Sequence, residues 1–408
     1  MQKLFVVFFV MVNLLNCSKN KVIIKEIGVN PDIHFIDVDK AEKVDDMFLS
    51  EICSEIKTII LETSDDILLG RVDIVQIYKD LLLILDRSNN VGLYAFNKEG
   101  KFIRKYGGRG GGPGEYISIS DFTIDKKNEI LYVLDSEADL ILKYEIETGK
   151  YIDKIIIENN IIDISFIQYN NERLYCFGEN YIESEIGCMV HEINMSTGKI
   201  TQCWLDTRIY NKGWSGSIRR AKESFFYARN QEAFKFVHFF MDTIISFEKD
   251  QVKPYVVFKD KDWISTNRIS RIMEIKNKKE FEGLTRELID NEISYNISKF
   301  VEWNDYFCFR YQKKMFSYFV LHNINTGNTK IAKYILNDLG YNEPNWLVND
   351  FICSDENGVY ELIDDFSLER YLEWIKVDGY VKKSLDKYEE LRNLPEDTNP
   401  VIFYYNFK

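Results

Sequence analysis

Histidine is scarce in this 408-residue chain, and the cysteines do not occur in close pairs. The four histidines are scattered, at His34, His191, His238 and His322. Past Cys17 the cysteines are Cys53, Cys176, Cys188, Cys203, Cys308 and Cys353. No zinc site, histidine-based acid-base cluster or cofactor is therefore expected. Several cysteines lie in apolar strand-like runs, which favours buried thiols, with a disulfide as the alternative in an oxidising compartment.

An excess of positive charge and long apolar runs are also missing. The formal net charge is −13, which argues against binding to nucleic acid and against general adhesion to anionic lipid. Past the N-terminus, no apolar run is long enough to span a bilayer. No Ser-His-Asp ordering, nucleophile elbow or metal-ligand cluster can be assembled from the sequence. These absences favour a binding protein over an enzyme.

The chain begins with the features of an export signal. Lys3 is followed by an apolar run from Leu4 to Leu15 that only Asn13 interrupts. About a dozen apolar residues are too few to cross a bilayer but match the central region of a signal peptide. The end of the run, Leu-Leu-Asn-Cys17, resembles a bacterial lipobox, in which the cysteine becomes the first mature residue and carries the lipid. We expect residues 1–17 to be a lipoprotein signal peptide, with a chance cysteine after an ordinary signal peptide as the alternative.

Strand-like segments separated by short turns recur along the rest of the chain. In the first repeat, Leu81–Asp86, Val91–Phe96 and Lys101–Tyr106 are joined by a loop and by a turn that ends at Gly100. Three later repeats have similar turns, ending at Gly149, Gly198 and Gly327. The spacing of about 45 residues is that of a four-stranded propeller blade, and turns that end in glycine suit antiparallel neighbours. The repeats predict an all-β fold, a six-bladed β-propeller with four-stranded antiparallel blades.

The strand count also predicts how the ring closes. The last of the six units, within residues 346–407, is one strand short. Because a closed propeller leaves no free edge, we expect Ile56–Leu61 to pair with Val401–Phe407. Residues 18–55 would then be an N-terminal linker and lead-in, and residues 56–408 the propeller. Apolar residues at helical spacing within 263–297 and 367–394 predict two helical insertions on one face of the ring.

Several segments resemble one family in particular. They are Ile59–Thr63, Phe96–Phe102, the glycine-rich Tyr106–Tyr116 (Tyr-Gly-Gly-Arg-Gly-Gly-Gly-Pro-Gly-Glu-Tyr), Asp121–Asp125, Thr243–Ile245, Lys253–Tyr255 and Asn399–Val401. Together they are similar to the six-bladed β-propeller lipoproteins of Bacteroidota, and in style to NHL-type propellers. The resemblance covers nearly the whole mature chain. It implies an exported, often lipid-anchored propeller in the cell envelope, here an outer-membrane lipoprotein, and it implies no shared catalytic residues.

The glycine-rich segment does not have the context of a phosphate-binding loop. Such a loop leads into the N-terminus of a helix with Lys-Ser or Lys-Thr, whereas Pro113–Tyr116 leads into the strand-like run Ser120–Asp125. Two interpretations stay open. The glycines can permit positive φ angles where one blade passes to the next, or the segment can contact a ligand through Arg109 and Glu115.

The position of the long connections predicts where recognition occurs. In four-stranded blades, the loops between second and third strands and the crossovers between blades emerge on one face, and the long segments of this chain all fall there. The candidate ligand contacts on this face are Arg109, Glu115, Tyr181, Arg208, Tyr210 and Trp214. Such side chains can stack on and hydrogen-bond to a polar ligand such as a glycan. The alternative is that Trp214 and the tyrosines pack under the helical insertions.

Two classes of function fit the sequence. The first is a binding or scaffold protein for a glycan, a peptide or an envelope protein, attached to the membrane through the N-terminal lipid only. The second is a polysaccharide lyase or hydrolase that uses residues of the propeller funnel, since spatial sites need not appear as motifs. A funnel cluster of an acidic residue, an arginine and a tyrosine with a perturbed pKa would favour the enzyme.

Overall fold

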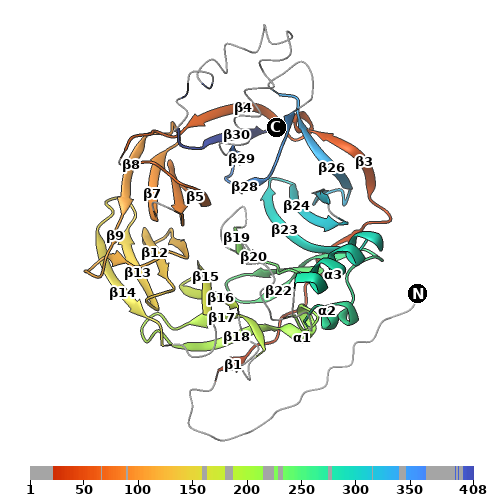
Figure 1. Cartoon of the computed structure of the whole chain (residues 1–408), viewed down its shortest axis with the longest axis horizontal. Coiled ribbons are helices and arrows are strands. Elements are labelled where there is room, and N and C mark those ends of the chain that lie inside the picture. Colours follow the sequence, from red (N-terminus) through yellow and green to blue (C-terminus); the bar gives the residue numbers. More distant parts are fainter. Residues whose placement is uncertain are drawn as a thin grey trace, which may run out of the picture.

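The computed structural model describes residues 22–65, 67–88, 91–158, 163–179, 187–214, 225–227, 233–273, 278–314, 316–339, 346–363, 391, 394 and 398–408. Over these ranges, small four-stranded sheets surround a common axis as six blades (Figure 1). The predicted six-bladed β-propeller is therefore confirmed.

The strands of each blade run in order from the axis of the ring to its outer edge. Blade 1 contains β5 (Val72–Tyr78), β6 (Leu81–Asp86), β7 (Gly92–Asn97) and β8 (Phe102–Tyr106). Blade 2 contains β11 (Asp121–Asp125), β12 (Ile130–Asp135), β13 (Leu140–Glu145) and β14 (Tyr151–Ile156). Blade 3 contains β15 (Asp163–Asn170), β16 (Arg173–Glu179), β17 (Cys188–Ile193) and β18 (Ile200–Asp206). Blade 4 contains β19 (Phe225–Tyr227), β20 (Phe234–Phe236), β21 (Thr243–Phe247) and β22 (Val252–Lys259). Blade 5 contains β23 (Ser294–Trp303), β24 (Tyr306–Lys313), β25 (Phe316–Asn323) and β26 (Thr329–Asn337). Blade 6 contains β28 (Phe351–Ser354), β29 (Gly358–Ile363), β30 (Val401–Phe407) and β4 (Cys53–Ile60).

Blade 6 joins the two ends of the propeller. β4 runs antiparallel to β30, with Ile59 opposite Ile402 and Ile56 opposite Tyr405. The predicted closure is confirmed, although the strand begins three residues earlier than expected. One segment expected in the last unit belongs elsewhere, because β27 (Trp346–Leu347) pairs with the end of β26 in blade 5.

The residues expected to form a linker contain three more strands. β1 (Ile23–Ile24), β2 (His34–Asp37) and β3 (Glu42–Phe48) pair in parallel with β18, β22 and β26, so each adds a fifth strand to blade 3, 4 or 5. We call residues 23–48 the N-terminal belt; it continues through the short helix η1 (Leu49–Glu51) into β4. Ile36 is fully buried in the core, whereas the adjacent Phe35 is 69% exposed. The belt is thus an integral part of the propeller.

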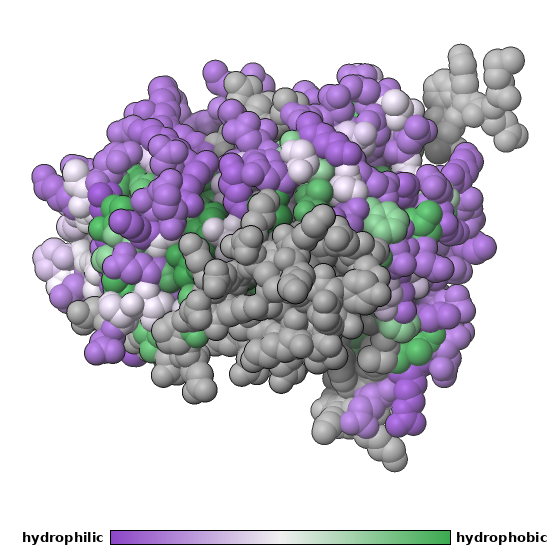
Figure 2. Space-filling model, turned by 90° about the horizontal axis from the view of Figure 1, so that it is seen from above, coloured by the Kyte–Doolittle hydropathy of each residue, from purple (hydrophilic) through white to green (hydrophobic). Residues whose placement is uncertain are grey.

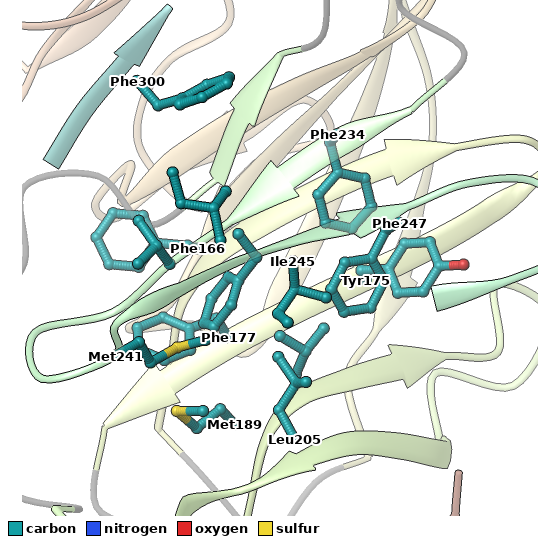
Figure 3. Close-up of a cluster of buried hydrophobic side chains, with 14 of the residues drawn as sticks. Phe166, Tyr175, Phe177, Met189, Leu205, Phe234, Met241, Ile245, Phe247 and Phe300 are labelled. Carbon is teal, nitrogen blue, oxygen red and sulfur yellow. The ribbon is translucent and has the colours of Figure 1, made fainter. Parts of the chain in front are cut away.

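Apolar side chains fill the spaces between neighbouring blades. Between blades 3 and 4, the rings of Phe234 and Phe247 stack with their centroids 4.6 Å apart, and Tyr175 packs against both (Figure 3). Strands such as β12 are buried along almost their whole length, because each sheet is covered on both faces. The face of the molecule seen in Figure 2 is mainly hydrophilic over its coloured atoms.

The two faces of the ring differ in their connections. The short-turn face has the turns between the first and second and between the third and fourth strands of a blade, whereas the opposite, crossover face has the remaining connections. On the short-turn face, Gly100 has a φ of +84°, and a Cβ there would lie 2.0 Å from the carbonyl oxygen of Ile60, so only glycine fits.

The described helices α1 to α3 belong to crossovers between blades. α1 (Thr207–Tyr210) follows blade 3, and α2 (Thr266–Met273) and α3 (Lys278–Asp290) follow blade 4. The insertion predicted within 263–297 is therefore helical, as expected. The insertion predicted at 367–394 lies outside the described residues, apart from Leu391 and Leu394.

Candidate functional site

The glycine-rich segment at residues 107–116 packs at the junction of blades 1 and 2. Tyr116 is buried, and the hydroxyl of Tyr144 donates a hydrogen bond to the carbonyl oxygen of Gly114 (2.9 Å). Gly114 has a φ of +74°, and a Cβ there would lie 2.8 Å from the Cβ of Tyr151. Gly114 is therefore required for this close packing, which supports the structural interpretation of the segment.

Arg109 and Glu115 belong to this junction. They lie in β9 (Gly108–Arg109) and β10 (Glu115–Tyr116), and β9 is at the outer edge of the ring in Figure 1. The Glu115 carboxylate accepts a hydrogen bond from the backbone N–H of Gly112 (2.7 Å), which closes the loop on itself, while Arg109 is exposed. Both side chains thus lie at the periphery of the ring, and a ligand-binding role for them stays a prediction.

Trp214 lies beneath the helices. Its side chain is 3% exposed, and its ring packs edge-on against Phe240 with the centroids 5.4 Å apart. The same apolar cluster includes Ile269 of α2 and Leu288 of α3. A ring covered in this way cannot stack on a ligand, so the ligand-binding prediction for Trp214 is wrong. The physical reason is that the amphipathic helices need an apolar surface to cover, and Trp214 provides part of it.

The other predicted contacts do not complete a shared site. In α1, Arg208 is exposed and forms an ion pair with Asp206, and Tyr210 is half-buried against the core. α1 lies on a different side of the ring from β9 (Figure 1). Tyr181 and the predicted lipidation site Cys17 lie outside the described residues. The described candidates on the crossover face are therefore dispersed.

A polar pocket lies on the opposite, short-turn face. Its volume is about 300 Å³, and it lies between the inner-strand ends of blades 2 and 3 and a turn of blade 4. Its polar lining residues are Asp125, Lys126, Lys127, Gln168, Tyr169, Asn170, Asn171, Glu172 and Lys249. Because β11 and β15 are the innermost strands of their blades, the pocket is next to the axis of the ring.

Hydrogen bonds between the two inner strands fix the walls of this pocket. The backbone N–H of Ile167 donates to the Asp121 carboxylate (2.8 Å), and the backbone N–H of Tyr169 donates to the Thr123 hydroxyl (2.9 Å). The side chains of Asp121 and Thr123 are buried. Such bonds hold β11 and β15 at a fixed separation, which gives the pocket a preformed shape.

Lys126 is presented by the turn between β11 and β12. The Asp125 carboxylate accepts hydrogen bonds from the backbone N–H groups of Lys127 and Asn128 (both 3.1 Å), which fixes this turn. Burial lowers the pKa of the Lys126 ammonium to about 8, although the charge of Glu356 on a turn of blade 6 acts to raise it. Since blades 2 and 6 are not neighbours, the influence of Glu356 places the amine toward the axis. Within the described part of the chain, Lys126 forms no hydrogen bond or ion pair.

Tyr169 provides an aromatic wall with a protonated hydroxyl. Its ring stacks on Tyr132 with the centroids 5.3 Å apart and the planes 12° apart. Burial raises the pKa of Tyr169, and the nearby carboxylate of Asp125 acts in the same direction. The phenol therefore stays protonated near neutral pH and can donate a hydrogen bond.

The charge of the pocket is locally positive in an acidic protein. Three lysines, Lys126, Lys127 and Lys249, face two carboxylates, and one lysine is neutralised because Lys127 pairs with Glu172 (2.9 Å). Lys249 is exposed at the rim. The pocket thus offers ammonium groups, a phenol and side-chain amides to a ligand, a combination that suits an anionic or carbonyl-rich molecule.

A second charged cluster, between blades 4 and 5, is closed to solvent. The Lys235 ammonium lies 3.9 Å from the centre of the Tyr255 ring and 3.7 Å from the Glu302 carboxylate, and the Tyr255 hydroxyl donates to the same carboxylate (2.6 Å). Burial lowers the pKa of Lys235 and raises that of Tyr255. Because Lys235 is 4% exposed, this cluster joins two blades and offers no surface to a ligand.

One segment of the sequence is a local signal for this pocket next to the axis, which we call the axial pocket. The segment Asp121–Asp125, which carries part of the family resemblance, supplies Asp125 to the pocket lining, holds β15 in place through Asp121 and Thr123, and leads directly to Lys126. The contribution of β15 could not be foreseen, because it depends on how blades 2 and 3 pack.

The described residues contain neither a metal-ligand cluster nor a membrane-spanning helix. Among them, no group of three or more His, Cys, Asp or Glu side chains is arranged to hold a metal ion. None of the helices in those ranges is both long and apolar enough to cross a membrane.

The fold and its axial pocket define a six-bladed β-propeller with a polar mouth on the short-turn face. The chain belongs to the family described as "Domain of unknown function (DUF4934)", whose model matches residues 33–406. No curated protein matches the sequence.

Two solved structures share the fold. One, from Bacteroides fragilis, is a protein named for its expected export; it has a TM-score of 0.69 and 20% identity over 92% of this chain and 99% of that chain. The other, a DUF4221 family member from Bacteroides vulgatus, has a TM-score of 0.52 and 10% identity over 87% and 98% of the two chains. At these identities the likeness concerns the fold alone.

Proposed function

We propose that this chain is an exported, lipid-anchored propeller that binds an acidic glycan in the pocket on the short-turn face. The observation that carries the proposal is the position of Lys126, a partly buried lysine without an ion-pair partner among the described residues, in a preformed polar pocket next to the ring axis. A buried ammonium of this kind is stabilised when an anionic ligand supplies the missing charge. The proposal also includes a location in the cell envelope and a relationship to NHL-type propellers, both of which we infer from the sequence.

The remaining lining supports a sugar as the ligand. Tyr169 presents an aromatic ring with a hydroxyl donor, and the partly exposed Asn171 brings an amide group to the same side of the pocket. Aromatic rings flanked by amides and hydroxyls match the alternating apolar and polar surface of a sugar ring. A volume of about 300 Å³ is at the lower end of ligand pockets, which suits one terminal uronic acid residue more than a long polymer segment.

Replacement of Lys126 tests this proposal. We expect Lys126→Met to weaken the binding of oligogalacturonides at least tenfold, about 1.4 kcal/mol, because the ligand carboxylate loses a charged hydrogen bond. Affinity for the unaltered protein should also fall as the pH rises through about 8, since the amine then loses its charge. Isothermal titration calorimetry of the full mature chain measures both effects.

The matched control is Lys154→Met, on the exposed outer strand of blade 2. It should leave the affinity unchanged, and both variants should melt at the temperature of the unaltered protein. Equal affinity of the two variants, or equally strong binding of the neutral, reduced-carboxyl oligosaccharide, would contradict the proposed site.

A lyase is the second candidate, because Asp125, Lys126 and Tyr169 form an acid-lysine-tyrosine cluster near the axis. With a pKa of about 8, Lys126 can accept the proton from the carbon next to a uronate carboxylate. The carbon–carbon double bond then forms as the glycosidic C–O bond breaks, and Tyr169 can protonate the leaving oxygen. An increase in ultraviolet absorbance from the unsaturated product that is lost in Lys126→Met would favour the lyase. If the unaltered protein gives no such increase, the chain binds the glycan without cleaving it.

Export and anchoring are tested at Cys17. The apolar run that ends at Leu-Leu-Asn-Cys17 supports lipid attachment at this cysteine. We expect Cys17→Ala to release soluble protein or to leave an uncleaved precursor, as shown by cell fractionation and mass spectrometry of the N-terminus. Membrane attachment that survives the substitution would show that the chain is held by another means.

A further inference from the structure

Strand addition recurs in this molecule. Blades 3, 4 and 5 each accept a segment of the N-terminal belt as a fifth strand on the outer edge. Among the described residues, the sheet of blade 6 ends at β4 instead, which pairs with β30 on one side only. β4 follows the belt in the chain, with only η1 between them. The free edge of β4 therefore continues the series of outer blade edges on which the belt adds parallel strands.

A groove of about 1120 Å³ follows this free edge. Its lining includes six consecutive residues of β4, Ser54–Ile59, and the turn residues Lys98 and Glu99 of blade 1. Because successive strand residues point to opposite faces, a groove that contacts all six must reach the edge of the strand, in addition to the face of the sheet that carries Tyr360 and Tyr404. The backbone N–H and C=O groups of an edge strand point in that direction, so the groove exposes main-chain donors and acceptors.

The floor of the groove is a fixed aromatic ring. The Tyr404 hydroxyl donates to the Asp355 carboxylate (3.2 Å), which also accepts from the Tyr360 hydroxyl (2.7 Å) and from the Lys98 ammonium (3.1 Å). A Cβ at Gly358 would lie 2.6 Å from Cε2 of Tyr404, so the ring rests directly on the backbone. Tyr404 is half-buried and presents its remaining surface to the groove.

The side chains at the rim are charged and of both signs. Glu55 and Lys57 are about half-exposed on β4, at 49% and 56%, and lie close to the partly buried Tyr404. An extended chain places alternate side chains on one face, so one apolar side chain can lie on Tyr404 while its neighbours two residues away meet these charges.

We propose that the free edge of β4 binds an extended polypeptide segment of another protein as a fifth strand of blade 6. A polypeptide fits because only a second backbone matches the spacing of donors and acceptors along a strand edge. The bound segment carries an aromatic or large aliphatic side chain at the position that covers Tyr404. This site is separate from the axial pocket and does not depend on the function proposed for it.

The test is a selection of heptapeptides from a random display library on the full mature protein. Strand addition predicts that N-methylation of alternate amides in a selected peptide lowers affinity at least tenfold, while methylation of the intervening amides is tolerated. It also predicts that the peptide slows hydrogen exchange within Ser54–Ile59, and that Tyr404→Leu weakens binding at least tenfold in a variant that melts normally.

Two controls separate the possible outcomes. Lys126→Met should leave peptide binding unchanged, so a failure here is distinct from a failure of the axial site. Tyr404→Phe keeps the ring and should retain most of the affinity. The proposal is overturned if no peptide is enriched, if all N-methyl positions are tolerated, if exchange is slowed elsewhere, or if an acidic oligosaccharide competes for the groove.

Discussion

Burial sets the protonation of the histidines at the residue scale. It lowers the pKa of His191 to about 4 and that of His238 to about 3, and it lowers the pKa of His34 and His322 as well. Each ring is therefore neutral in the native protein at a pH where an exposed histidine is charged. The opposite case is Glu361, whose pKa burial raises to about 8, so the native protein holds a proton there.

These shifts predict a loss of stability in mild acid. Between about pH 6.5 and pH 4 the unfolded chain binds protons at His191 and His238 that the native protein does not, so each lowers the free energy of unfolding by about 1.4 kcal/mol per pH unit as the pH falls. Glu361 acts in the opposite sense between about pH 8 and pH 4.5, because there the native protein binds the extra proton.

Removal of one buried histidine isolates its contribution. We expect His238→Leu to reduce the dependence of unfolding free energy on pH by about 1.4 kcal/mol per pH unit between about pH 5 and 6. Guanidinium denaturation at a series of pH values measures this slope. A slope equal to that of the unaltered protein would mean that His238 is protonated in the native state after all; Lys154→Met serves as the reference variant.

At the scale of elements, the N-terminal belt contributes to the core. β2 inserts Ile36 into the apolar cluster shared by blades 2 to 5, whereas Phe35 points outward on the same strand. The belt also covers the outer edges of three blades, which would otherwise present unpaired backbone groups.

Adjacent positions in β2 provide a matched pair of substitutions. We expect Ile36→Ala to lower the free energy of unfolding by about 2–5 kcal/mol, because it leaves a cavity in the core, and Phe35→Ala to change it by less than about 0.5 kcal/mol. Chemical denaturation of both variants measures the difference. Similar, small effects at the two positions would show that the belt is only loosely attached in solution.

At the scale of the whole molecule, the pairing of β30 with β4 closes the ring. The last strand, β30, lies between β29 and β4, so it connects the chain end to a segment about 350 residues earlier. A closed ring removes the free edges that an open propeller would expose.

Loss of this strand should open the ring. Deletion of residues 401–408 leaves β4 without its strand partner and exposes one edge of β29, so we expect aggregation and loss of the cooperative melting transition. Size-exclusion chromatography and thermal unfolding measure the outcome, with deletion of Lys408 alone as the control. A monomeric truncated protein with unchanged melting would show that blade 6 does not need β30 for closure.

Much of the architecture follows from local patterns along the chain. Turns that end in Gly100, Gly149, Gly198 and Gly327 all have a positive φ at the glycine, as the hairpin interpretation requires. β6 and β30 have the bounds expected of them, because continuous apolar runs between turns leave little freedom for the strand ends. The candidate ligand contacts were less well predicted, since exposure of a tyrosine, tryptophan or arginine depends on what packs over it.

The sequence by itself determined the repeat, the strand order and the pairing of the chain ends, because backbone hydrogen bonding and turn chemistry are encoded over a few residues at a time. Only the tertiary structure decided that the belt adds strands to three blades, that Trp214 is covered by helices, and that Lys126 meets Tyr169 in an axial pocket. Each of these depends on contacts between segments that are distant in the chain. Such contacts are set by how neighbouring blades pack, and no local pattern records them.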